Sequence, residues 1–449
     1  MREQLESCWR AAVAAVDAGA AVTRALAHTA PRKQPLHLLA FGKAAPAMAE
    51  AATAWLTAHG RSPAGGVVIG PDEDSIRRAA GHTVPLEQSW GDHPVPAAAS
   101  YRAAEAVARA VSAVGPGDAA MVLLSGGTSS LIAAPIPGLS DSDLRRLWRL
   151  LLDSGLDIHA MNAVRRHFTR WSGGRLALAL SGRPVDVLAI SDVPGDDPAS
   201  IGSGPCSADP FTAPEIERLL EEAGLFAELP PSLAAMLRGT RPLAPTAQPG
   251  DGALADVHTR VIASNEDAVR AAADRARSLD WHVQIRPEPL TGDAAAAGAF
   301  LAEQLVGAVT ESPSEPRCIV SGGETTVSLG SSAPVGGRCQ ELALAAARVL
   351  RRADAGARVA LLAAGTDGRD GPTDAAGAVV DGETWRRICA AGRDPDADLA
   401  SHDSYRALNA AGALFRTGST GTNVMDLVIG VRVPAGWNSS AANPDVRQG

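Results

Sequence analysis

Short apolar runs alternate with helix-like stretches along most of the chain, and this pattern limits the fold more than any other feature of the sequence. Most of the runs are continuously apolar, as expected for strands that helices cover on both faces. The candidate strands are residues 36–41, 65–70, 119–125, 185–191, 259–264, 282–287, 317–322, 358–365 and 426–433. Strand–helix alternation of this kind predicts parallel sheets in an α/β fold.

Two helical stretches carry signals at their ends. Ser100 stands at the head of an alanine-rich stretch that runs to residue 114, and Ser140 precedes a stretch with early aspartates that stops at Gly155. A serine at this position can accept hydrogen bonds from free N–H groups of the first turn, and a glycine ends the helix. We therefore expect helices over 100–114 and 140–155, each capped by its serine.

The chain of 449 residues is long enough for two or three domains, each with its own core. The clearest change in composition is the segment 239–256, which is rich in proline, glycine and alanine and is typical of an interdomain linker. The sequence therefore predicts one domain over residues 1–242 and a second over residues 255–432.

Charge and cysteine usage limit the class of protein. The net charge of −9 and the lack of a basic cluster argue against binding to nucleic acid or to anionic membranes. No uncharged run is long enough to span a bilayer, and residues 1–19 carry early acids rather than the apolar core of a signal peptide. The five cysteines are scattered without metal-binding spacing, which fits a reducing compartment. We expect a cytoplasmic protein.

Ligands of open α/β sheets bind beyond the carboxyl ends of the strands, and a lysine stands at the first such place. The chain has 41 Lys and Arg residues, of which only Lys33 and Lys43 are lysines. Lys43 follows the strand 36–41 after Gly42, at the mouth of the next helix, where the helix dipole also favours an anion. A compact ammonium group is not equivalent to the planar guanidinium of arginine, although composition alone also allows a lysine retained by chance.

Glycines and hydroxyl groups follow the strand 119–125. Gly126 and Gly127 allow close approach of a ligand, and Ser125, Thr128 and Ser129 offer oxygens and amides to a phosphate group. The same turn also occurs where the chain packs tightly, so the pattern alone leaves both interpretations open.

Carboxylates and one arginine follow three later strands. Asp192 comes directly after the strand 185–191, where a carboxylate can hold Mg²⁺ or accept the proton of a hydroxyl group. Asp367, Asp370 and Asp374 form the densest acidic cluster, with a solvated loop as the alternative. Glu324 ends the strand 317–322, and Arg338 precedes a helix, where it can grip an anion with two hydrogen bonds. These oxygen ligands favour Mg²⁺ over Zn²⁺.

Several motifs of other enzyme classes are missing from the sequence. There is no Walker A pattern, no protein-kinase signature, no G-x-S-x-G elbow followed by histidine and aspartate, and no G-x-G-x-x-G near the start. The last absence weakens an NAD-dependent dehydrogenase. An aspartyl-phosphate phosphatase built on "TDGRDGPTD" ranks last, because the stretch lacks the D-x-D pair of that chemistry.

Eight blocks in one order resemble the glycerate 2-kinase family, the two-domain type with a MOFRL-like C-terminal domain. Besides the stretches above they include "GDHPVPAAAS", "NAVRRHFTRWSGGRLA", "VIASNEDAV" and "TGSTGTNVMDLVI", and the resemblance runs from Leu36 to Arg432. It implies a Rossmann-like N-terminal domain and a smaller C-terminal one, both three-layer α/β with mostly parallel sheets, and an active site in the cleft between them. It further implies transfer of the γ-phosphoryl group of ATP, with Mg²⁺, to the 2-hydroxyl of D-glycerate.

The resemblance also implies roles for particular residues of this chain. Catalytic roles fall to Lys43, Arg338 and Asp192, and metal ligation to Asp192 and Asp367. Cofactor binding falls to Ser125, Gly126, Gly127, Thr128, Ser129, Glu324 and Asn265. The expected partner is a small hydroxy acid, with no nucleic acid or membrane, and the assembly that it allows is a homodimer.

Five positions depart from the family pattern. Ser172 replaces a lysine, Cys339 and Met425 each stand where asparagine is usual, Cys206 replaces a threonine, and Asp92 replaces a small residue. The departures leave two alternatives open: a kinase for a different, bulkier hydroxy acid, and a retired homologue that binds a metabolite without turnover. His93 and His167 are either polar residues of the site or buried, hydrogen-bonded histidines.

Overall fold

The computed structural model describes residues 1–79, 86–93, 95–156, 158–307, 315–327, 335–353, 357–434 and 437. The chain forms two compact units. The first unit is Ala18–Ala263, and the second unit combines Met1–Asp17 with Ser264–Gly449. The predicted domain ranges, 1–242 and 255–432, therefore differ from these units at both ends. The segment 239–256 does not link the units: it precedes strand β6 (Val257–Ala263), which pairs with β5 (Val185–Ile190) inside the first unit.

The first unit is built on a sheet of six strands in the order β3-β2-β1-β4-β5-β6. The strands not yet named are β1 (Leu36–Phe41), β2 (Gly65–Gly70), β3 (Glu87–Trp90) and β4 (Ala119–Leu124). Every pairing in this sheet is parallel, as predicted. All residues of β1 and β4 are buried, which explains why these strands are apolar apart from His37.

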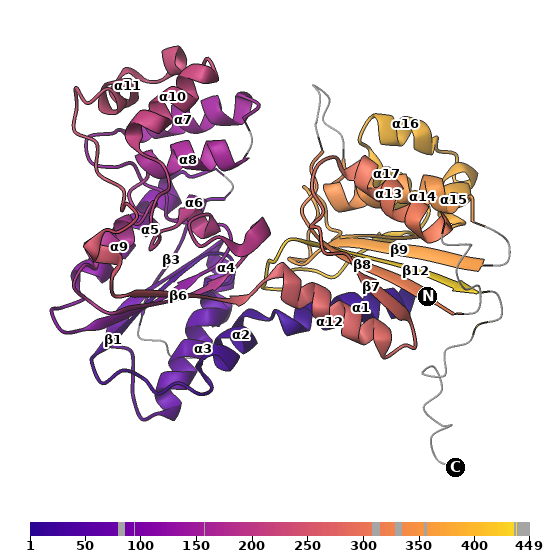
Figure 1. The fold of residues 1–449 in the computed structure, drawn as a ribbon, viewed down its shortest axis with the longest axis horizontal. Helices are drawn as coiled ribbons and strands as arrows, with labels where there is room; N and C mark the ends of the chain where they lie inside the picture. The colour runs from indigo at the N-terminus through magenta and orange to yellow at the C-terminus, as the bar shows by residue number, and fades with distance from the viewer. Residues whose placement is uncertain are drawn as a thin grey trace. The chain divides into compact units, whose positions relative to one another are not determined.

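Helices cover both faces of this sheet (Figure 1), and a separate group of helices has its own core. Helices α2 (Ala18–Leu26) and α3 (Ala45–Ala58) lie on one face, and α5 (Ala98–Ser112) lies on the other. The separate group comprises α7 (Asp141–Asp153), α8 (Ile158–Phe168), α10 (Ala213–Glu222) and α11 (Pro231–Leu237). Shorter elements are α4 (Glu73–Ala79), α6 (Thr128–Leu131), α9 (Arg175–Ala179), η1 (Pro194–Asp196), η2 (Ile201–Ser203), η3 (Phe226–Glu228) and η4 (Gly252–Leu254).

Of the two predicted serine caps, one is confirmed and one is wrong. Ser140 caps α7, because its Oγ accepts a hydrogen bond from the Asp143 N–H at 3.1 Å. Ser100 lies inside α5, which begins two residues earlier. The carboxylate of Asp92 caps α5 instead, accepting from the N–H groups of Ala99 at 2.8 Å and Ser100 at 3.3 Å. Asp92, one of the departures from the family pattern, thus has a structural role.

The second unit contains a six-stranded sheet in the order β11-β10-β9-β12-β8-β7. Its strands are β7 (His282–Ile285), β8 (Arg317–Gly323), β9 (Ala357–Gly365), β10 (Gly377–Asp381), β11 (Leu414–Phe415) and β12 (Asp426–Pro434). The α/β class is confirmed, but only β7 and β8 pair in parallel here, and the other pairings are antiparallel. One reason is that β10 follows β9 after a loop, with no crossover helix to return the chain.

Helices cover this second sheet on both faces as well (Figure 1). On one face lie α1 (Arg2–Ala15) and α12 (Asn265–Arg277). On the other lie α13 (Ala294–Gly307), α14 (Arg338–Leu350), α15 (Thr384–Ala390), α16 (Pro395–Ala400) and α17 (Ser404–Ala410). In the part of the chain that the structure describes, no helix has both the length and the apolar character needed to cross a membrane.

Candidate functional site

The carboxyl ends of β1 and β4 are tied together around Lys43. The Lys43 N–H donates to the Gly126 carbonyl at 2.9 Å, and the Ala44 N–H donates to Ser125 Oγ at 3.0 Å. Gly42 makes this crossing possible: its φ is +119°, and a Cβ there would lie 2.2 Å from Ser125 Oγ. The predicted turn after β1 therefore delivers the partly buried Lys43 to the start of α3.

The predicted site residue Gly127 and the histidine His93 lie beside Lys43. A Cβ added to Gly127 would lie 3.4 Å from Lys43 Cγ and 3.3 Å from His93 Cδ2. Gly127 has a φ of +85°, so its backbone also favours glycine. His93 is exposed, whereas His167 is buried and contacts the Ala163 carbonyl at 3.2 Å. Of the two histidines left open by the sequence, only His93 therefore lies at this edge of the sheet.

Asp192 reaches the same place from the end of β5. A Cβ added to Gly126 would lie 2.0 Å from Asp192 Oδ2, so the absence of a side chain at Gly126 makes room for this carboxylate. Burial raises the pKa of Asp192, and the positive charge of Lys43 opposes this rise. The structure thus brings Lys43, Gly126 and Asp192 together, as expected for the ends of neighbouring parallel strands.

The hydroxyl groups of the β4 turn are used within the protein. Thr128 Oγ1 donates to the Ser125 carbonyl at 2.8 Å, and Ser125 Oγ already accepts from Ala44. Both side chains are buried, whereas Ser129 is partly exposed. Both hydroxyl groups therefore help to shape the turn, and the phosphate contacts expected of this turn stay predictions.

In the second unit, Arg338 is held by two carboxylates. It is the first residue of α14, and its Nε and Nη2 donate to Asp426 Oδ2 and Oδ1 at 2.5 and 3.0 Å. Its Nη1 lies 2.8 Å from Glu324 Oε1. Burial acts to lower the pKa of Arg338, but Asp426 and Glu324 outweigh it and the net direction is upward. Arg338 therefore stays charged, and Glu324 is its direct partner.

The cluster of three aspartates predicted after β9 does not exist in space as one group. Asp370 is buried and caps α14, accepting from the N–H groups of Cys339 at 3.1 Å and Gln340 at 2.8 Å. Asp374 is exposed and pairs with Arg416 at 2.9 Å. Asp367 and Asp370 both lie near Asp426: a Cβ on Gly365 would lie 3.3 Å from Asp367 Oδ1 and 3.4 Å from Asp426 Oδ1, and the charges of Asp426 and Arg338 both act on the pKa of Asp370. Neighbours in sequence thus serve three different purposes.

Asn265, predicted to bind cofactor, has its amide group engaged inside the second unit. Its Nδ2 donates to the carbonyls of Val424 at 2.7 Å and Asp426 at 3.1 Å, and the residue is buried. A Cβ on Gly322 would lie 1.8 Å from Asn265 Oδ1, so α12 packs directly on β8 at this point. Asn265 thus fixes the start of β12, where Asp426 lies, and its cofactor contact stays a prediction.

Within the described residues, no group of three or more His, Cys, Asp and Glu side chains is arranged to hold a metal ion. The two predicted Mg²⁺ ligands belong to different units, Asp192 to the first and Asp367 to the second. Mg²⁺ is often bound through one or two carboxylates together with substrate phosphates and water, so the metal roles of Asp192 and Asp367 stay predictions.

Two residues of interest escaped the sequence predictions. Asp426 stands at the first position of a buried strand, and an acid there is a signal, since acids are almost never buried without a partner. Glu341 is also buried, and its carboxylate lies 2.9 Å from Nδ1 of His402. Burial raises the pKa of Glu341, and the hydrogen bond from His402 opposes the rise.

Besides Asp92, the four departures from the family pattern occupy buried positions. Cys339 is buried among acids and burial raises the pKa of its thiol, and burial raises that of Cys206 to about 12, so neither thiol is a reactive thiolate. Ser172 is buried and its carbonyl accepts from Arg175 at 3.3 Å. Met425 has a φ of +67°, a region that asparagine adopts more readily than methionine. Nothing in the structure explains the methionine.

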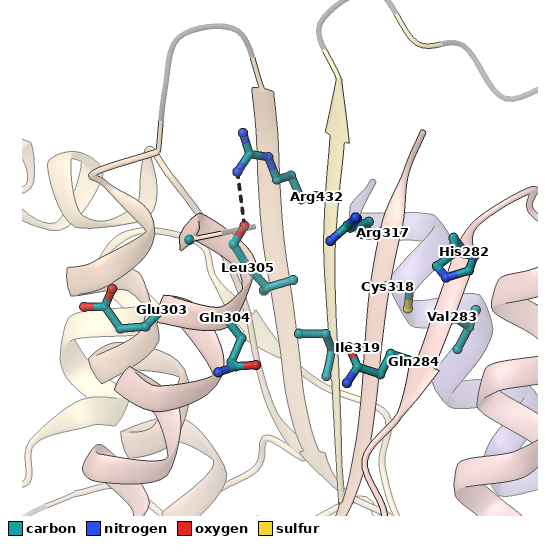
Figure 2. A pocket seen from close by; sticks show the side chains of 11 residues that line it. His282, Val283, Gln284, Glu303, Gln304, Leu305, Arg317, Cys318, Ile319 and Arg432 are labelled. Carbon is teal, nitrogen blue, oxygen red and sulfur yellow. Dashed lines mark hydrogen bonds between the residues drawn. The ribbon is translucent and has the colours of Figure 1, made fainter. Parts of the chain in front are cut away.

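A separate pocket of about 700 Å³ opens in the second unit (Figure 2). Arg432 lies at its rim and donates to the carbonyls of Leu305 at 3.4 Å and Val306 at 2.9 Å. The pocket includes Arg317 at the start of β8, whereas Glu324 follows the end of that strand. It contains none of the predicted site residues.

Comparison with known proteins agrees with the resemblance seen in the sequence. Residues 4–238 match the family model described as a domain of unknown function (DUF4147), and residues 317–426 match the MOFRL family. A glycerate 2-kinase of Pyrococcus horikoshii is 38% identical over 343 residues, 76% of each chain. A D-glycerate 2-kinase of Thermotoga maritima is 36% identical over 405 residues, 88% of this chain and 90% of that protein. The chain belongs to the glycerate 2-kinase family.

Solved structures of family members support the assignment. The crystal structure of glycerate kinase from Thermotoga maritima has a TM-score of 0.82 and 33% identity, and covers 96% of this chain and 99% of that one. One relative, from Agrobacterium vitis, is 37% identical over 437 residues and carries a provisional hydroxypyruvate reductase name. That name makes a reductase assay a necessary control for any test of this family member.

Proposed function

We propose that this family member is an ATP-dependent kinase that phosphorylates the 2-hydroxyl of D-glycerate to give 2-phosphoglycerate. The observation that carries the proposal is the placement of Lys43 beside Asp192 and Gly126 in a member of the glycerate 2-kinase family. A cation and a carboxylate at the ends of parallel strands suit phosphoryl transfer, which needs positioning and charge neutralisation more than covalent chemistry.

Asp192 and Lys43 have complementary roles in the proposed reaction. Asp192 accepts the proton of the 2-hydroxyl group, and a raised pKa makes a carboxylate a better base. As the bond from that oxygen to the γ-phosphorus forms, the bond from the γ-phosphorus to the bridging oxygen of ATP breaks. Lys43 contributes an ammonium group to an oxygen of the transferring group or to the substrate carboxylate. Its charge also opposes the rise that burial causes in the pKa of Asp192.

Arg338 supplies the second cation of the proposal. Its guanidinium stabilises charge on the transferring phosphoryl group, a role that in other phosphotransferases raises the rate by about 10³- to 10⁵-fold. Mg²⁺, when bound to ATP, would neutralise the phosphate oxygens; Asp367 is the carboxylate we assign to it, and holding Mg²⁺ is the alternative role of Asp192. Gly126, Gly127 and Ser129 remain the proposed contacts for phosphate oxygens. A homodimer and a cytoplasmic location stay predictions.

The test is an assay of ADP release with ATP, Mg²⁺ and a panel of hydroxy acids, followed by phosphorus NMR to identify the phosphorylated carbon. D-Glycerate should be the best acceptor. Better turnover of a bulkier hydroxy acid would favour the kinase of different specificity, and nucleotide binding without ADP release would favour the retired homologue. Oxidation of NADH with hydroxypyruvate in place of ADP release would contradict the proposal.

A matched pair of variants tests the role of Lys43. Lys43→Met should lower kcat at least about 100-fold with an unchanged thermal midpoint, because it removes a charge from the reacting group and keeps the apolar stem. Lys33→Met is the control, since Lys33 is the only other lysine and is exposed. Equal turnover of the two variants would refute the role.

A further inference from the structure

The two carboxylates that hold Arg338 differ in burial and in geometry. The Asp426 side chain is 5% exposed and contacts the guanidinium through both oxygens, whereas the Glu324 side chain is 38% exposed and meets the guanidinium at Nη1. A paired, buried carboxylate costs much to separate from its arginine, and an exposed single contact costs little. The two contacts of Arg338 therefore differ in how readily they can open.

Asp426 is fixed by its surroundings as well as by Arg338. It is the first residue of β12, which pairs with β8 on one side and β9 on the other, and its carbonyl accepts from Asn265 Nδ2 at 3.1 Å. Its two oxygens engage Nε and Nη2 in the planar fork geometry that guanidinium and carboxylate share. Asp426 thus fixes the plane of the guanidinium and directs Nη1 toward the more exposed side, where Glu324 lies.

Glu324 has a fixed backbone and a more exposed side chain. It follows the end of β8, and its N–H donates to the Leu290 carbonyl at 2.9 Å. Its carboxylate sits on the guanidinium nitrogen that Asp426 does not contact. A phosphoryl or carboxylate oxygen is also an anionic acceptor, so it would meet Arg338 at this same nitrogen.

We propose that Asp426 is the positioning residue for Arg338, and that Glu324 is a displaceable substitute ligand that yields Nη1 to an anionic oxygen of the substrates. This inference rests on the proposed function for its biological meaning, but not for its test. It assigns Glu324 a competing role in place of the predicted cofactor contact. The Glu324 carboxylate also disfavours weakly charged compounds, because only an anion that binds Arg338 more strongly than this carboxylate can displace it.

The test measures binding of inorganic phosphate by titration calorimetry to the full chain and its variants. Glu324→Gln removes the competing charge and should tighten phosphate binding about 2- to 5-fold, the range expected for one exposed ion pair. Adding Arg338→Met to that variant should abolish the gain. A second titration with D-glycerate identifies whether phosphoryl or carboxylate oxygen benefits. Glu383→Gln is the matched control, because Glu383 is an exposed acid of the same unit paired with Arg386.

Asp426→Asn should weaken phosphate binding at least about 10-fold and lower kcat with little change in the KM for ATP. If this variant fails to fold, Glu324→Gln and its double variant still decide the question. No gain in Glu324→Gln, a gain that survives Arg338→Met, or an equal gain in Glu383→Gln overturns the inference. A wild-type protein that binds phosphate in this pattern but releases no ADP would contradict only the proposed function.

Discussion

The buried cap of α14 predicts a pH-dependent stability that can be measured directly. Burial, aided by the charge of Asp426, raises the pKa of Asp370 from 3.8 to about 7, although two N–H groups and Arg338 oppose the rise. Between these two pKa values the folded protein binds more protons at this site than the unfolded chain does. The free energy of unfolding therefore falls as the pH rises through this range.

The size of the effect follows from the difference between the two pKa values. About three pH units at 1.36 kcal/mol each give about 4 kcal/mol, fully present below pH 4 and lost above pH 7. Asp370→Asn removes the titration. It also loses one of the two N–H contacts, because its amide has a single oxygen, which lowers stability by about 1 kcal/mol at any pH.

The assay is urea unfolding of both proteins at several pH values between about 5 and 8. We expect the wild-type minus variant difference in unfolding free energy to fall by about 1 kcal/mol per pH unit between pH 5 and 7 and to level off above pH 7. We compare the difference between the unfolding free energies of the two proteins because the titration of the other groups, which both proteins share, then cancels. If the unfolding free energies of the two proteins changed with pH in parallel, the argument would be refuted, since Asp370 would then keep an ordinary pKa.

Three further variants test the local packing arguments. Gly126→Ala should lower kcat at least about 10-fold with little loss of stability, because the new Cβ meets Asp192 Oδ2. Gly252→Ala, in open space, should leave both unchanged, and a normal kcat in Gly126→Ala would contradict the reasoning. Arg175→Met should destabilise the protein by about 3–5 kcal/mol in urea, because this buried guanidinium donates to five backbone carbonyls. Asp92→Ala should cost about 1 kcal/mol through loss of the α5 cap, and an unchanged unfolding midpoint would contradict that role.

Most of the strands could be predicted from the sequence because burial on both faces makes them continuously apolar. The three strands that the apolar runs missed have particular reasons. β3, "EQSW", is polar and has no buried residue, β11 has two residues, and β10 lies inside a stretch dominated by its aspartates. Strand direction in the second sheet could not be predicted, since a strand buried on both faces shows no alternation in either orientation.

The rule that ligands bind beyond the carboxyl ends of strands explains which site residues the sequence predicted and which it missed. Lys43 and Asp192 follow parallel strands, so the rule placed them at one edge of the first sheet. Asp426 precedes its strand, and the rule ignores such positions. Because β12 is antiparallel to β8 and β9, its beginning pairs with Gly323 and Gly365 at their ends, and Asp426 arrives at the same edge from the other direction. The acidic cluster failed because closeness in sequence does not fix where loop side chains point.

The N-terminal helix has a practical consequence for dissecting the chain. Trp9 packs edge-on against Phe415 at 5.1 Å, and Arg2 donates to the carbonyls of Gly412 and Leu414, so α1 completes a core whose other residues come some 250 positions or more later. The first unit is thus an insertion, and excising either half takes two cuts rather than one. A fragment that starts at Ser264 would leave an apolar face bare and should aggregate unless residues 1–17 are joined back to it.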